Sequence, residues 1–124
     1  MGLDMYAFSV AKNEGNEQFA IPEGSKPVEI AYWRKFNALH GWMEDTARGL
    51  GFDGTFNCVP VQLSPVLINQ LEDDLRHGLL KPREGFFFGS QDIHPEDIEA
   101  TVQFIEAARD AFESGKDVYY DSWW

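Results

Sequence analysis

The sequence is poor in cysteine and in long apolar runs, and each shortage excludes a class of protein. The single cysteine, Cys58, cannot form a disulfide within the chain, so a disulfide scaffold is excluded. We expect Cys58 to be a small buried apolar residue. No apolar run approaches the ~18 residues of a membrane span, and no basic region leads an apolar stretch at the N-terminus. These features predict a soluble intracellular protein.

The motifs of common catalytic and metal sites are also missing. His40, His77 and His94 are scattered, without the His/Cys spacing that is typical of zinc sites. The chain has no GxxxxGK[ST] phosphate loop, no GxGxxG after a strand and no GxSxG nucleophile turn. We therefore predict no metal, no cofactor and no catalytic residue, which means a protein that is not an enzyme.

Negative charge is what the chain has in excess. It carries 21 acidic residues against 10 basic ones, a formal net charge of -11 over 124 residues. Its hydrophobic fraction of 44% and aromatic fraction of 15% are too high for a disordered acidic tail, because such tails lack apolar surface to bury. We predict one folded domain, residues 1–124, whose surface repels nucleic acid and anionic membranes and attracts basic surfaces.

The apolar pattern predicts four strands and three helices in the order β-α-β-α-β-α-β. The expected strands are residues 3–10, 56–63, 85–90 and 118–124. The expected helices run from Pro27 or Val28 to Gly49, from Ser64 to Gly78 and from His94 to Ser114. The fold class is therefore α+β, with a four-stranded mixed or antiparallel sheet that the three helices cover mainly on one face.

The first of these helices is predicted from one apolar stripe. Its members are spaced i, i+4, i+7 and i+11, and they are Tyr32, Phe36, Leu39 and Met43. Polar and aromatic residues flank the stripe and suggest a small ligand pocket. We expect Ser90, from the strand predicted over 85–90, to contribute to it. This candidate pocket consists of Trp33, Arg34, Asn37, His40 and Ser90. A helix packed by large aromatic residues is the alternative interpretation.

The negative charge is concentrated near the C-terminus, where residues 92–121 hold nine acidic and two basic residues. On the last helix most of these acids fall on a side distinct from the inward stripe of Ile98, Val102, Ile105 and Phe112. Like charges so spaced cost a few tenths of a kcal/mol per pair, which suggests a functional reason for them. The candidate partner-binding residues are Asp92, Glu96, Asp97, Glu99, Glu106, Asp110 and Glu113. A solvated face that keeps the protein soluble is the alternative.

The chain ends in an aromatic segment, residues 119–124, with the sequence YYDSWW. Because alternate residues of a strand face opposite sides, one of the two terminal tryptophans is expected to be an exposed contact residue.

Four segments together resemble a family of small phage and prophage proteins. They are residues 1–6 (MGLDMY), 32–42 (YWRKFNALHGW), 85–90 (GFFFGS) and 119–123 (YYDSW). A small acidic phage protein is also similar to anti-CRISPR proteins, which implies an inhibitor of a type I effector complex in the cytoplasm of a bacterial host. The resemblance carries over no catalytic residues.

Two functions follow from the sequence. The first is a monomeric inhibitor that imitates the charge of DNA and blocks a basic DNA-binding surface on a host nucleoprotein complex, without contacting nucleic acid or membrane itself. The alternative is a protein that binds or sequesters a nucleotide signal at the candidate pocket around Trp33 and His40.

Overall fold

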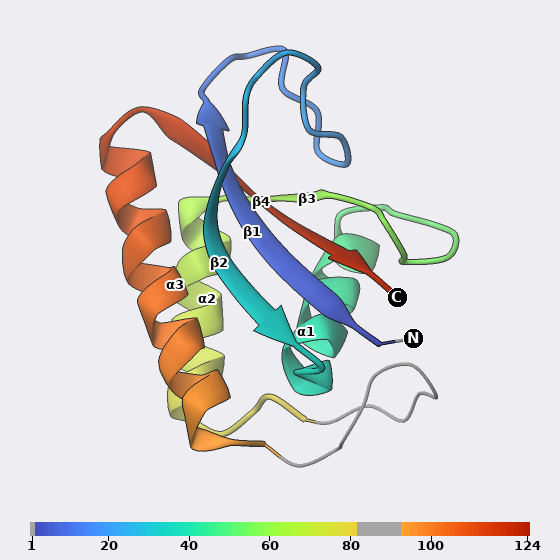
Figure 1. Ribbon diagram of the computed structural model, residues 1–124, viewed down its shortest axis with the longest axis vertical. Helices are drawn as coiled ribbons and strands as arrows, with labels where there is room; N and C mark the ends of the chain where they lie inside the picture. The colour runs from blue at the N-terminus through green and yellow to red at the C-terminus, as the bar shows by residue number, and fades with distance from the viewer. Residues whose placement is uncertain (1, 82–92) are drawn as a thin grey trace.

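The two ends of the chain pair with each other at the centre of the sheet (Figure 1). In the computed structural model, which describes residues 2–81 and 93–124, the strands are β1 (Asp4–Ala11), β2 (Val28–Arg34), β3 (Val61–Leu63) and β4 (Lys116–Trp123). β1 and β4 are antiparallel over their whole lengths, from Asp4 opposite Trp123 to Ala11 opposite Lys116. β2 flanks β1 and β3 flanks β4, so the order is β2-β1-β4-β3 and each pair is antiparallel.

Three helices cover one face of this sheet (Figure 1). They are α1 (Asn37–Gly49), α2 (Pro65–Arg76) and α3 (Pro95–Glu113). Alternate strand residues such as Met5 and Tyr120 face the helices and are fully buried. Trp33 of β2 joins the layers, since its ring meets Phe104 of α3 edge-on at 5.2 Å and its Nε1–H donates to the Thr101 hydroxyl at 3.1 Å. The α+β prediction, with four antiparallel strands and three helices, is confirmed.

Residues 28–34 form a strand, so the helix expected from Pro27 or Val28 was wrong in its first part. The chain turns from β2 into α1 at Lys35, which has a left-handed backbone with φ of 59°. The Lys35 N–H donates to the Leu3 carbonyl at 2.8 Å and holds this turn against the start of β1. Phe36, Leu39 and Met43 do share the buried side of α1, whereas Tyr32 belongs to the strand.

The region before α2 also differs from its prediction. Only Val61–Leu63 of the strand expected over 56–63 is formed, and it lies at an edge of the sheet directly after Pro60, a residue that edge positions tolerate. Cys58 is exposed, with φ of 58°, and is not the buried residue that we expected. The strand predicted over 85–90 lies outside the described residues, and the elements within them follow the order β-β-α-β-α-α-β.

The second face of the sheet carries aromatic side chains and is covered at one end by residues 12–27. Tyr119 is the covered residue, and its hydroxyl donates to the Glu17 carbonyl at 2.6 Å. The Gln62 N–H also donates to the Gln18 carbonyl at 2.8 Å, which ties this loop to β3.

Among the helices that the structure describes, none is long and apolar enough to cross a bilayer.

We predict that Ser64→Ala lowers the free energy of unfolding by about 1 kcal/mol. The Ser64 hydroxyl accepts the Leu67 N–H at 3.3 Å, and Pro65 follows it at the first helical position of α2. Urea denaturation followed by circular dichroism measures this loss. Ser114→Ala, at the exposed C-terminal end of α3, is the control and should change stability by less than about 0.5 kcal/mol. Equal losses in both variants would contradict the capping role of Ser64.

Candidate functional site

Five of the six acidic residues of α3 lie on the side of the helix that faces away from the sheet. The buried side consists of Thr101, Phe104, Ile105, Ala108 and Ala111. At about 100° per residue, five exposed acids fall within roughly 100° of arc on the opposite side. These residues, called the acidic ridge below, are Glu96, Glu99, Glu106, Asp110 and Glu113. The structure therefore brings together five of the seven predicted partner-binding residues.

The other two predicted residues do not belong to the ridge. Asp97 is half-buried on the sheet side of α3, and burial raises the pKa of its carboxyl. Asp92 lies outside the described residues. The inward stripe is also rotated from its prediction, because Val102 is 43% exposed and Phe104 and Ala108 take the central buried positions.

No cation among residues 2–81 and 93–124 forms an ion pair with a carboxylate of the acidic ridge. The only basic residue within α3, Arg109, is turned toward α2. Its guanidinium donates to both oxygens of the Glu72 carboxylate at 2.8 and 3.1 Å, and to the Asn69 side-chain oxygen at 2.9 Å. The hydrogen bond from Arg109 lowers the pKa of Glu72. Arg109 therefore supports the packing of α2 on α3 and leaves the ridge uncompensated.

The acidic residues of α3 differ in whether their position along the helix stabilises it. Glu96 lies in the first turn, where a negative charge is favourable beside the positive end of the helix dipole. Asp110 and Glu113 lie in the last turn, which contains no basic residue, and there a negative charge is unfavourable. Glu106 stands one turn before Asp110, so the two like charges also repel each other. These three carboxylates weaken the helix that carries them.

The candidate pocket does not lie on one surface. Trp33, Asn37 and His40 are buried, whereas the Arg34 side chain is 61% exposed on the opposite face of the sheet, and Ser90 lies outside the described residues. His40 Nδ1 lies 2.7 Å from the Tyr120 hydroxyl, and burial holds the pKa of Tyr120 well above its usual value. Trp33 and His40 thus contribute to the core between sheet and helices.

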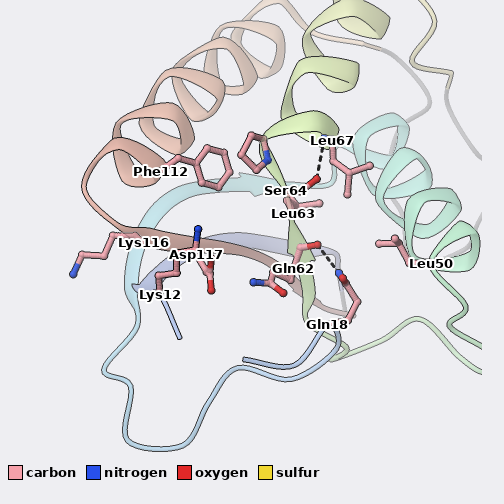
Figure 2. Close-up of a pocket in the computed structure, with 11 residues that line it drawn as sticks. Lys12, Gln18, Leu50, Gln62, Leu63, Ser64, Leu67, Phe112, Lys116 and Asp117 are labelled. Carbon is pink, nitrogen blue, oxygen red and sulfur yellow. Dashed lines mark hydrogen bonds between the residues drawn. The ribbon is translucent and has the colours of Figure 1, made fainter. Parts of the chain in front are cut away.

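A hollow lies elsewhere, between β3, the start of α2 and the end of the β1–β4 pair where Ala11 faces Lys116. It has a volume of about 510 Å³ (Figure 2). Lys12 and Lys116 contribute to its wall, but the Lys116 ammonium points away from the other labelled side chains. Asp117 stands beside them and accepts a hydrogen bond from the Asn16 amide at 2.8 Å. The hollow offers no concentration of positive charge for an anionic ligand.

Sequence reasoning missed Asp121, whose setting is unusual for a carboxylate. It points to the face of the sheet away from the helices, opposite Tyr6 of β1, and it is half-buried there. Burial raises its pKa, although its own Oδ1 accepts the Ser122 N–H at 2.8 Å. Its position in the aromatic segment YYDSWW was the available signal, because alternation places Asp121 and Trp123 on the same face.

No protein-family model, curated protein or solved structure matches the chain. The function is therefore argued from the arrangement of the chain's own residues.

We predict that Asp121→Asn stabilises the protein at pH 7. The folded protein holds the Asp121 proton more tightly than the unfolded chain does, because burial raises its pKa. Stability is therefore lost as pH rises from the unfolded pKa of about 3.9 through the higher folded value. The asparagine removes this loss and keeps an oxygen for the Ser122 N–H.

Urea titrations at pH 7 and pH 3 measure the effect. The unfolding midpoint of Asp121→Asn should exceed that of the wild type at pH 7. The difference should disappear at pH 3, where Asp121 is protonated in both the folded and the unfolded protein. Asp53→Asn, at an exposed loop position outside the helices and strands, is the matched control for the same chemical change. A variant that is less stable than the wild type at pH 7 would show that Asp121 stabilises the fold.

Proposed function

We propose that this protein is a non-catalytic inhibitor that occupies a basic DNA-binding surface of a host nucleoprotein complex through the acidic ridge of α3. In this proposal it is phage-encoded, acts in the bacterial cytoplasm and has the character of an anti-CRISPR protein directed at a type I complex. The exposed, uncompensated carboxylates of Glu106, Asp110 and Glu113 are the observation that carries the proposal.

The energetic position of these carboxylates supports a binding role over a purely solubilising one. Solubility requires negative charge somewhere on the surface, and the first turn of α3 or the loops accept it at lower cost. The last turn of α3 is an unfavourable place for it. Charges that destabilise the free protein are explained when a partner's cations compensate them in the complex.

The spacing of the ridge supports an imitation of one nucleic-acid strand. From Glu96 to Glu113 the helix rises about 26 Å, at ~1.5 Å per residue, and the five carboxylates are on average about 6 Å apart along it. One DNA strand has a phosphate about every 3.4 Å of helix axis. The ridge thus has roughly half the charge density of one strand, which fits a single row of Lys and Arg side chains.

We predict that neutralising Glu106→Gln, Asp110→Asn and Glu113→Gln together weakens binding to the target complex at least about tenfold. Removing the repulsion along α3 should at the same time raise the thermal unfolding midpoint. The measurement is competition with target DNA for a purified type I effector complex, alongside a melting curve. Lost inhibition in a more stable variant cannot be ascribed to misfolding.

The matched control removes the same amount of charge from another surface. Glu14→Gln, Glu17→Gln and Glu23→Gln change three exposed acids in the loop between β1 and β2. Net charge becomes -11 + 3 = -8 in both triple variants. If the two variants lose inhibition equally, overall charge is responsible and the ridge is not the binding surface.

We also predict that the wild-type affinity falls about ten- to hundredfold between 50 and 200 mM salt, as expected for about two to four ionic contacts with released counterions. The ridge variant should show a flatter dependence, since most of these contacts are removed. Affinity measured by biolayer interferometry over a salt series gives both slopes. Parallel slopes for the two proteins would assign the salt effect to residues outside α3.

A further inference from the structure

The face of the sheet away from the helices carries a second set of side chains with a common chemistry. The members of this open face are Asp4, Tyr6, Phe8, Tyr32, Asp121 and Trp123, and strand pairing sets them side by side. Tyr6 lies between Phe8 and Tyr32, with ring centroids at 6.0 and 5.2 Å. Tyr32 is 46% exposed and Trp123 is 65% exposed, so two large aromatic surfaces face solvent.

The two carboxylates of the open face differ in how they are compensated. Asp4 accepts the Tyr32 hydroxyl at 2.7 Å and has the Arg34 guanidinium at 3.9 Å. Asp121 lies on the neighbouring strand, and no Lys or Arg among the described residues pairs with it. A half-buried carboxylate without a cation destabilises the free protein. It is therefore a group that a partner's cation would compensate.

The Trp123 ring is exposed on the open face, so a partner's cation can reach it from solvent. A hollow of about 390 Å³ lies beside the ring, with Gly2, Asp4, Arg34 and Trp124 on its wall. Trp124 is held by Asn57, whose side chain bonds to its carbonyl at 2.9 Å and to its N–H at 3.0 Å. These two hydrogen bonds anchor the chain at the residue that follows Trp123.

We propose that the open face binds an arginine side chain of a basic partner segment, with the guanidinium stacked on Trp123 and hydrogen-bonded to Asp121. The occupant follows from charge complementarity. An aromatic ring and an uncompensated carboxylate two residues apart on one strand match a planar cation that stacks and donates several hydrogen bonds. Lysine offers a compact and strongly hydrated charge, and it gains less from the rings. A second copy of this chain brings another net charge of -11 and is disfavoured as the occupant.

This binding does not depend on the acidic ridge, because α3 lies on the other side of the sheet. The test uses the peptide acetyl-Gly-Arg-Gly-Arg-Gly-amide and its citrulline counterpart, which has the same shape without the charge. Titration is followed by the indole N–H resonance of Trp123 and by the dissociation constant. The arginine peptide should shift this resonance and the citrulline peptide should not.

Variants locate the site. Asp121→Asn should weaken arginine-peptide binding about tenfold and Trp123→Ala about fivefold. The Glu106→Gln, Asp110→Asn, Glu113→Gln triple variant removes more charge but should bind within about twofold of the wild type, since exposed distant charges are largely screened. Retained amide spectra in each variant confirm that the fold is intact.

Three results would overturn the proposal. One is the absence of any Trp123 shift up to the solubility limit of the arginine peptide. Another is binding that the triple variant loses while Asp121→Asn keeps it, which would place the peptide on α3. The last is a concentration-dependent dimer in sedimentation that Trp123→Ala abolishes, which would make a second copy the occupant of the open face.

Discussion

The antiparallel pairing of β1 with β4 is the constraint on which the other features depend. It joins residues at the two ends of the chain, in register from Asp4 opposite Trp123 to Ala11 opposite Lys116. This register decides which side chains enter the core, because a shift of one residue would exchange the two faces. It sends Met5 and Tyr120 toward the helices and leaves Tyr6, Asp121 and Trp123 on the open face. The core, the placement of α3 and the aromatic face all follow from one alignment.

Sequence patterns identified most of the elements and failed where two patterns overlapped. The N-terminal strand, the Ser64-Pro65 helix start and the last helix each have a strong local signal, and all three are confirmed. Residues 28–34 contain strand-forming side chains, but Tyr32 also stands four residues before Phe36. This spacing matched the apolar stripe of α1 and extended the predicted helix into β2. The turn at Lys35 has no glycine or proline to reveal it, because a lysine adopts the left-handed backbone there. The residues of the candidate pocket are separated for the same reason, since Arg34 belongs to β2 and His40 to α1.

The acidic residues divide into those that support the fold and those that do not. Glu72 accepts hydrogen bonds from the Arg109 guanidinium. Asp74 accepts the Trp42 indole N–H at 2.8 Å, and Asp4 accepts a hydrogen bond from the Tyr32 hydroxyl. These groups connect α2 to α3, α1 to α2 and β1 to β2. The ridge has no such partner among the described residues, and the excess of negative charge is therefore local as well as global. Composition showed the excess, but only the direction of Arg109 showed where it stays uncompensated.

The two proposed surfaces have different ranges of action and lie on opposite layers. In the proposed functions, the ridge would act at a distance, because several exposed charges attract a basic surface before contact, and salt would weaken this attraction. The open face would act at contact, because stacking on Trp123 and desolvation of Asp121 require a fitted cation. A flat partner surface cannot contact both, since the sheet and helix layers separate them. A partner that used both would have to curve around the molecule or present two subunits, as a multisubunit nucleoprotein complex does. The ridge would then govern the rate of encounter, and the open face would select among basic partners.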